Sequence, residues 1–164
     1  MTPERPPEEG YKQPVSVLVV IHTADLHVLL LERADFPDHW QSVTGSRDPD
    51  EDLVDTARRE VLEETGIDVD DYALHDWHVT NEYEIFPHWR HRYPPGTMVN
   101  TEHVFSLDVR VPVPVRLSAR EHSRHVWLPF QAAAARCFSW SNRDAILALP
   151  QHAVRTGAAE RTRG

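Results

Sequence analysis

The feature that most constrains the fold is a short acidic segment, residues 59–66, with the sequence REVLEETG. On an α-helix its glutamates Glu60, Glu63 and Glu64 stand at positions i, i+3 and i+4, within an arc of about 100°. Three carboxylates placed so close together repel one another. A helix that keeps them therefore needs a partner of opposite charge or full exposure to water.

The residues around this segment predict the helix itself. Gly66 directly follows the last predicted turn, where a glycine commonly ends a helix in the left-handed conformation. The start is less sharply defined, because either Asp48, with Glu51 as its capping-box partner, or one of the next two aspartates can serve as N-cap. Residues 51–65 also carry an apolar stripe of helical spacing, made of Leu53, Val54, Ala57 and Val61.

Two interpretations of the clustered acids remain open on charge alone. A run of carboxylates usually marks a solvated helix face. The other interpretation is a site for a divalent cation, since Mg²⁺ and Mn²⁺ prefer carboxylate oxygens together with substrate phosphates. Such a cation makes water more acidic and offsets phosphate charge, so this helix is a candidate catalytic element.

The remaining pattern predicts a layered domain of strands and helices. Apolar, β-branched runs predict six strands at 14–21, 27–33, 40–45, 73–86, 99–109 and 124–128. Two further helices are expected at 130–137 and 142–150. Strands interleaved with and followed by helices imply an α+β or α/β domain with a mixed sheet. The domain is expected to span residues 11–153, between flexible tails at 1–10 and 154–164.

Composition excludes several classes of protein. The 164 residues carry a formal net charge of −9, which argues against general affinity for nucleic acid. No apolar run approaches the ~18 residues of a membrane span, and the N-terminus has no apolar signal segment. Cys137 is the only cysteine, so intramolecular disulfides are impossible and a reducing cytoplasm is expected.

The acidic helix belongs to a longer pattern. From Gly45 the chain reads GSRDPDEDLVDTARREVLEETGI. This stretch resembles the Nudix box, the loop–helix–loop signature of a family of diphosphate hydrolases, and it meets every fixed position of that signature. Many members have glycine at the positions of Ser46 and Asp50, a departure that concerns the loop and leaves the acids intact. The resemblance implies an α/β/α sandwich with a mixed sheet.

The resemblance also implies roles for individual residues. Glu51 and Arg59 would brace the loop against the helix, and Gly45 would allow close approach of the backbone to metal or phosphate. Glu121 is the candidate for a distal acid, and whether Glu60 or Glu121 is the general base stays open. The metal ligands would be Glu60, Glu63, Glu64 and Glu121, holding Mg²⁺ with Mn²⁺ as a possible substitute.

Other stretches, among them EIFPHWRHRYPPG (84–96) and FSWSNRDAI (138–146), resemble bacterial Nudix hydrolases that act on dihydroneopterin triphosphate. The implied reaction is Mg²⁺-dependent hydrolysis of 7,8-dihydroneopterin 3′-triphosphate to the monophosphate and pyrophosphate, in folate synthesis. The alternatives are a nucleotide-cleaning pyrophosphohydrolase of dNTPs such as dATP, a non-catalytic Nudix-fold sensor and an RNA cap hydrolase, the last disfavoured by the net charge. The partner is thus a small pterin or nucleoside triphosphate, and the oligomeric state is not predicted.

By position match, the implied substrate contacts are Lys12, Arg33, Thr44, Gly45, Tyr83, Glu84, Ile85, Phe86 and Ser139. The two cations can offset triphosphate charge, the aromatic rings can stack on a flat pterin, and Glu84 can accept hydrogen bonds from ring N–H groups. Strand alternation places Tyr83 and Ile85 opposite Glu84 and Phe86, so core packing is the alternative role for some of the four.

Overall fold

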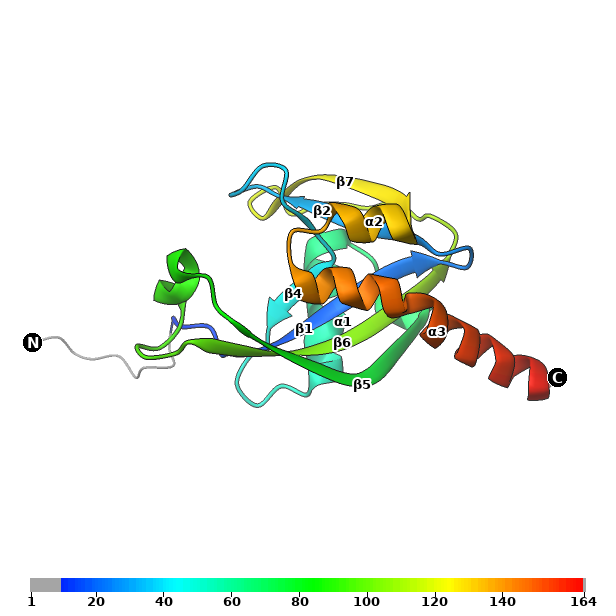
Figure 1. The fold of residues 1–164 in the computed structure, drawn as a ribbon, viewed down its shortest axis with the longest axis horizontal. Coiled ribbons are helices and arrows are strands. Elements are labelled where there is room, and N and C mark those ends of the chain that lie inside the picture. The colour runs from blue at the N-terminus through cyan, green and yellow to red at the C-terminus, as the bar shows by residue number, and fades with distance from the viewer. Residues whose placement is uncertain (1–9, 164) are drawn as a thin grey trace, which may run out of the picture.

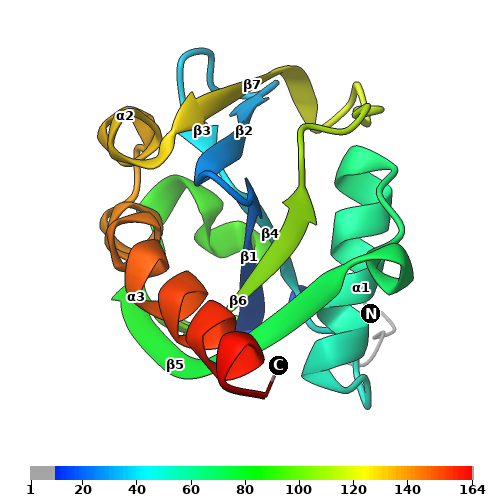
Figure 2. The ribbon, with the colours of Figure 1, turned by 90° about the vertical axis from the view of Figure 1, so that its right-hand side faces the viewer.

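The computed structural model describes the backbone of residues 10–163 and the side chains of residues 10–153. The predicted N-terminal tail, 1–10, lies outside the described residues except for Gly10. Figure 1 and Figure 2 show a sheet with helix α1 on one face and helices α2 and α3 on the other. The predicted α/β/α sandwich is therefore confirmed. Within residues 10–163, no helix combines the length and apolar character needed to cross a membrane.

The sheet is built around β1 (Val15–Thr23), whose residues are almost all buried because the strand is covered on both faces. It pairs in parallel with β6 (Val99–Arg110), and β6 pairs antiparallel with β5 (Ala73–Glu84). On the other side, β2 (His27–Arg33) pairs with the end of β1 and with β7 (His122–Pro129). The sheet is thus mixed, as the sequence predicts.

The strand predicted at 40–45 is in fact two strands. β3 (Trp40–Gln41) pairs with β2, whereas β4 (Val43–Ser46) pairs with the first half of β1. The chain changes partners at Ser42, so β2 and β4 lie beside different halves of the same central strand. This split in the sheet is where the candidate site forms.

Two apolar cores fill the layers. Val17, Val19 and Phe105 face α1 (Leu53–Thr65), and Leu18, Val20 and Val104 face α2 (Phe130–Arg136) and α3 (Trp140–Arg163). Alternate residues of β1 and β6 therefore feed opposite cores, as the two-residue period of a strand requires. Two short 3₁₀ helices, η1 (Val69–Asp71) and η2 (Pro87–Arg92), were not predicted.

Helix α1 matches the prediction with two corrections. It begins at Leu53 after Asp52, whose side chain makes no capping hydrogen bond, and Asp48 instead forms a turn with Glu51 ahead of the helix. Val54 is 41% exposed and does not belong to the buried stripe. Gly66 ends the helix with φ 76°, in the left-handed conformation expected for it.

Helix α3 is longer than predicted. It begins at Trp140 and continues past the expected end at residue 150 to Arg163, through the segment predicted to be a C-terminal tail. Figure 1 shows its second half extending beyond the sheet. Pro150 lies inside this helix and cannot donate the usual backbone hydrogen bond to residue 146. Ile146 and Leu149 are buried ahead of this proline, and His152 after it stacks on Trp77 with 3.7 Å between the ring centroids.

Candidate active site

The acidic helix does not present a solvated face. Glu60 and Glu64 are only 9% and 2% exposed, and they continue the buried stripe formed by Ala57 and Val61. Only Glu63 is turned to solvent. Burying two neighbouring carboxyl groups in a row of core positions is unfavourable unless something compensates their charge. The solvated-face interpretation therefore fails for Glu60 and Glu64.

The pKa values of Glu60 and Glu64 also indicate that burying these carboxyl groups disfavours their charged forms. Burial raises the pKa of Glu64 well above its usual value, and the adjacent Glu60 and Glu121 raise it further. Burial also raises the pKa of Glu60, against the lowering effects of its hydrogen bond with Glu64 and of Arg59. Oε1 of Glu64 is buried and has no hydrogen-bond partner. Two buried carboxyl groups sharing a hydrogen bond, with one oxygen unpartnered, form a site that a cation would stabilise.

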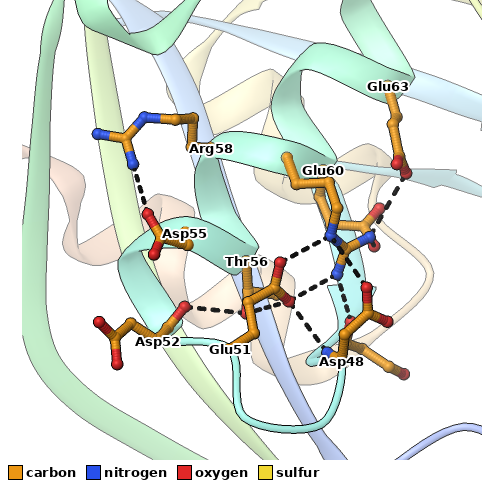
Figure 3. A network of polar contacts seen from close by, with 10 residues as sticks. Asp48, Glu51, Asp52, Asp55, Thr56, Arg58, Glu60 and Glu63 are labelled. Carbon is orange, nitrogen blue, oxygen red and sulfur yellow. Dashed lines mark hydrogen bonds and ion pairs between the residues drawn. The ribbon is translucent and has the colours of Figure 1, made fainter.

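Arg59 organises the loop before the helix. Figure 3 labels four of the acids around it, Asp48, Glu51, Glu60 and Glu63. The guanidinium group of Arg59 donates two hydrogen bonds of 2.9 Å to the Glu51 carboxylate and one of 3.0 Å to the carbonyl oxygen of Ser46. It also lies 3.0 Å from Glu60 and 3.5 Å from Glu63. The bond with Arg59 lowers the pKa of Glu51 to about 2, so Glu51 stays ionised. Arg59 thus ties the loop, the helix start and two of the acids together.

Gly45 is required for space and not for its backbone conformation. Its φ lies outside the left-handed region that favours glycine. A Cβ at this position would collide with the carboxyl group of Glu60. Glycine therefore lets the Glu60 side chain lie directly against β4.

One cavity of about 1040 Å³ collects nearly all the residues singled out from the sequence. Glu51 is the exception, because it sits behind Arg59 and does not line the cavity. Glu121 lies just before β7 and faces the cavity near Glu64. The predicted residues that line it are Lys12, Arg33, Thr44, Gly45, Arg59, Glu60, Glu63, Glu64, Tyr83, Glu84, Ile85, Phe86, Glu121 and Ser139.

Several of these side chains are already engaged. Thr44 donates its hydroxyl to the carbonyl of Val17, leaving its backbone N–H for Glu64. Arg33 bonds both oxygens of Asp35 at 2.8 Å and stacks over Trp89, with 4.5 Å from the guanidinium carbon to the ring centroid. Desolvation and the neighbouring Arg92 lower the pKa of Lys12. Anionic phosphates beside Lys12 would relieve this cationic crowding.

The cavity has an aromatic side, where the sequence predicted Phe86 but not Trp89 and Phe138. Helix η2 carries His88 and Trp89, which contact Phe86 and Phe138, the latter from the segment before α3. Phe86 is 45% exposed, so its ring is available at the cavity wall, whereas Ile85 is buried in the core. The alternation expected along this segment is present. Phe86 fits a stacking role and Ile85 fits the packing alternative.

Carboxylate oxygens form a suitable ligand set for a hard divalent cation. In the described part of the chain, however, no three His, Cys, Asp or Glu side chains converge closely enough to make a finished metal site. Arg59 draws Glu60 and Glu63 toward itself, and Glu64 contacts Glu60. Binding a cation therefore requires these side chains to reorient. The unpartnered oxygen of Glu64 provides a starting point.

Sequence reasoning missed a second polar group at the opposite wall of the cavity. Asn100 and Glu102 lie two residues apart on β6 and are buried, as are Ser16 on β1 and Ser141 on α3. The sequence signal for this group is the polar pair Asn100 and Glu102, two residues apart at the start of a largely apolar strand.

The mixed sheet between helices, with a buried acidic pair at the split between β2 and β4, defines a Nudix-type fold and site. The NUDIX domain model matches residues 12–149. This chain belongs to the Nudix family.

Relatives within the family carry a more specific name. The chain is 50% identical over 142 residues to the dihydroneopterin triphosphate diphosphatase of Escherichia coli K12, covering 85% of this chain and 93% of the relative. The Haemophilus influenzae enzyme of the same name is 42% identical over 139 residues, covering 83% of this chain and 87% of the relative. The solved E. coli dihydroneopterin triphosphate pyrophosphohydrolase superimposes with a TM-score of 0.79 at 48% identity, covering 84% and 95% of the two chains.

Proposed function

We propose that this protein hydrolyses 7,8-dihydroneopterin 3′-triphosphate to dihydroneopterin monophosphate and pyrophosphate. The observation that carries the proposal is one cavity with buried carboxyl groups, cationic side chains and an aromatic wall, in a chain 50% identical to an enzyme named for this reaction. The location would be the cytoplasm and the pathway folate synthesis, which matches the single cysteine and the pterin substrate.

Lys12 and Arg92 would bind the triphosphate. Lys12 lies within electrostatic reach of both Glu60 and Glu64, so the phosphates would bridge the cationic and acidic parts of the cavity. Arg33 lies on the same side but is held by Asp35. We expect it to position the neighbouring Trp89 ring and to add positive potential.

The acids Glu60, Glu63, Glu64 and Glu121 would hold Mg²⁺, with Mn²⁺ as a substitute. When bound, the cation offsets phosphate charge and makes water more acidic. Water adds to one of the two phosphorus atoms that share the bridging oxygen, the P–O bond from that phosphorus to the bridge breaks, and the product that keeps the bridging oxygen leaves with the electron pair of that bond. Glu60 or Glu121 would accept the proton from the water. Arg59 would brace the loop against the helix, because it bonds Glu51 and the carbonyl oxygen of Ser46 together.

The test is turnover by the purified protein with Mg²⁺ and, in parallel, dihydroneopterin triphosphate and each dNTP, with pyrophosphate release followed. We expect the highest kcat/KM for the pterin compound. Glu64→Gln should lower kcat by roughly 1,000-fold while retaining the fold. Asp55→Asn is the matched control, because Asp55 lies on the same helix and bonds Arg58 outside the cavity.

Higher kcat/KM for a dNTP would replace the pterin assignment with a nucleotide hydrolase. Binding without turnover of any triphosphate would indicate the non-catalytic sensor. Full activity of Glu64→Gln would show that Glu64 is not a metal ligand.

A further inference from the structure

A polar wall of the cavity lies on the α3 side of the sheet, whereas α1 with its acids packs on the other side. β6 places Asn100 and Glu102 on one face of the sheet, where they line the cavity with exposures of 1% and 4%. Both point to the α3 side, together with Val104 of the same strand. These two side chains therefore form a buried polar floor within an otherwise apolar layer.

This floor holds two hydrogen-bond acceptors without partners. Oδ1 of Asn100 and Oε1 of Glu102 are both buried and unbonded. The amide nitrogen of Asn100 is already committed, because it donates to Oγ of Ser16 at 2.8 Å and to the hydroxyl of Tyr83 at 3.0 Å. Buried acceptors are normally paired, so the cavity lacks a group that supplies hydrogen-bond donors.

The surroundings of Glu102 hold its carboxyl group in place without neutralising it. Hydrogen bonds with Ser141 of α3 and Asn81 of β5 fix it from two sides. No Lys, Arg or His side chain forms an ion pair with Glu102 among the residues whose side chains are described. Burial raises the pKa of Glu102. The missing partner is thus a ligand rich in N–H groups.

We infer that Glu102, assisted by Asn100, selects the ring of the substrate by accepting hydrogen bonds from a 2-amino-4-oxopyrimidine edge. This inference rests on the proposed function and deepens it, because a pterin ring carries that edge. Its ring N–H and 2-amino group are adjacent donors, which the unpartnered Oε1 of Glu102 and Oδ1 of Asn100 would accept. Guanine presents the same pair. Hypoxanthine keeps the ring N–H but lacks the 2-amino group, so it offers one donor where a pterin or guanine offers two.

This assignment moves ring recognition away from Glu84. The sequence suggested Glu84 for ring N–H groups, but its side chain is exposed, whereas Glu102 is buried at the cavity floor. An exposed carboxylate stays paired with water when no ligand is bound, so it gains less from a ligand donor than a buried one. Glu102 should therefore discriminate between substrate rings more strongly than Glu84.

The first experiment compares rings and needs no variant. Wild-type kcat/KM should be at least about 10-fold higher for dGTP than for dITP, which lacks the 2-amino group. Equal values for the two nucleotides would overturn the inference. Because it uses the unaltered protein, this comparison also covers the case in which a variant fails to fold.

The second experiment uses Glu102→Gln, with Glu82→Gln as the matched control. Glu82 lies on β5, is exposed and does not line the cavity. We expect Glu102→Gln to lower kcat/KM for dihydroneopterin triphosphate by roughly 10- to 100-fold, mainly through KM, and to remove the preference for dGTP over dITP. A loss confined to kcat, or an unchanged preference, would contradict the inference.

Neopterin, which has the ring but no phosphate, separates the two proposals. Its intrinsic fluorescence should report binding to the wild type and to Glu82→Gln, with roughly 10-fold or greater weakening in Glu102→Gln. If neopterin binds with these affinities but the protein hydrolyses no triphosphate, the inference that Glu102 recognises the ring stands and the proposed function fails. Hydrolysis of the pterin substrate with equal neopterin affinity in all three proteins would overturn ring recognition while the proposed function stands.

Discussion

At the scale of single residues, the site depends on carboxyl groups placed where a helix normally carries apolar side chains. Glu60 and Glu64 occupy the same buried stripe as Ala57 and Val61. Their pKa values are raised because burial disfavours the charged form, so this placement opposes ionisation. Burying Glu60 and Glu64 lowers local stability, but it places these acids beside the cavity.

Gly45 determines whether Glu60 can occupy its position. In Gly45→Ala the new methyl group would collide with the Glu60 carboxyl group, so that side chain must leave the wall of β4. We expect kcat to fall by about 100-fold, since misplacing a catalytic group by ~1 Å has effects of this size. The measurement is pyrophosphate release with Mg²⁺, together with thermal unfolding.

Gly96→Ala is the control for this substitution. Gly96 has φ 88°, and no neighbouring atom lies within 4 Å of the position that an alanine methyl group would take. Alanine there strains the backbone but meets no neighbour, so this variant should lose about 1 kcal/mol of unfolding free energy and keep its activity. Full activity of Gly45→Ala would show that Glu60 does not need its observed position.

At the scale of secondary-structure elements, the change of partner at Ser42 creates the opening for the site. The buried side chain of Asn142 on α3 accepts a 2.7 Å hydrogen bond from the Ser42 N–H and donates a 3.0 Å bond to its hydroxyl. A backbone group between two strands loses its ladder partner, so this amide replaces it. Helix α3 thereby holds the split between β3 and β4.

Replacing Asn142 tests this function of the helix. Asn142→Ala should lower the free energy of unfolding by about 2 kcal/mol, because it leaves the buried N–H of Ser42 unsatisfied. The measurement is chemical denaturation, with Gln151→Ala as the control at an exposed position of the same helix. Equal denaturation midpoints for Asn142→Ala and the wild type would assign no stabilising role to this contact.

At the scale of the whole molecule, each of the two apolar cores positions a different part of the site. The core on the α1 side fixes the acids, and the core on the α3 side fixes the floor formed by Asn100 and Glu102. The cavity connects the two at the split in the sheet. A substrate with phosphates at one end and a flat ring at the other suits this arrangement.

Cation binding should be visible in the stability of the entire domain. A cation that binds only the folded state raises its stability by about 2.7 kcal/mol at 100 times its Kd. We therefore expect Mg²⁺ to raise the Tm of the wild type and to leave that of Glu64→Gln nearly unchanged, with NaCl of equal ionic strength as the control. Equal shifts in both proteins would show that Glu64 does not hold the cation.

Much of the fold was predictable because its signals are local. The apolar runs of β1 and β2, the periodicity of α1 and the left-handed Gly66 each depend on a few neighbouring residues. The break at Ser42 was missed because it depends on Asn142, one hundred positions away. The burial of Val54 was predicted wrongly for a related reason, since periodicity shows a stripe but not where the core ends.

By itself, the sequence determined the family, the mixed sheet and the acidic helix, because spacing along one element already fixes which side chains share a face. Only the tertiary structure decided which acids are buried, which partner each strand takes and which carboxylate reaches the floor of the cavity. Those outcomes depend on contacts between residues far apart in the chain. Glu84 and Glu102 illustrate the difference, since both are glutamates on strands and only packing against α3 makes one of them a buried acceptor.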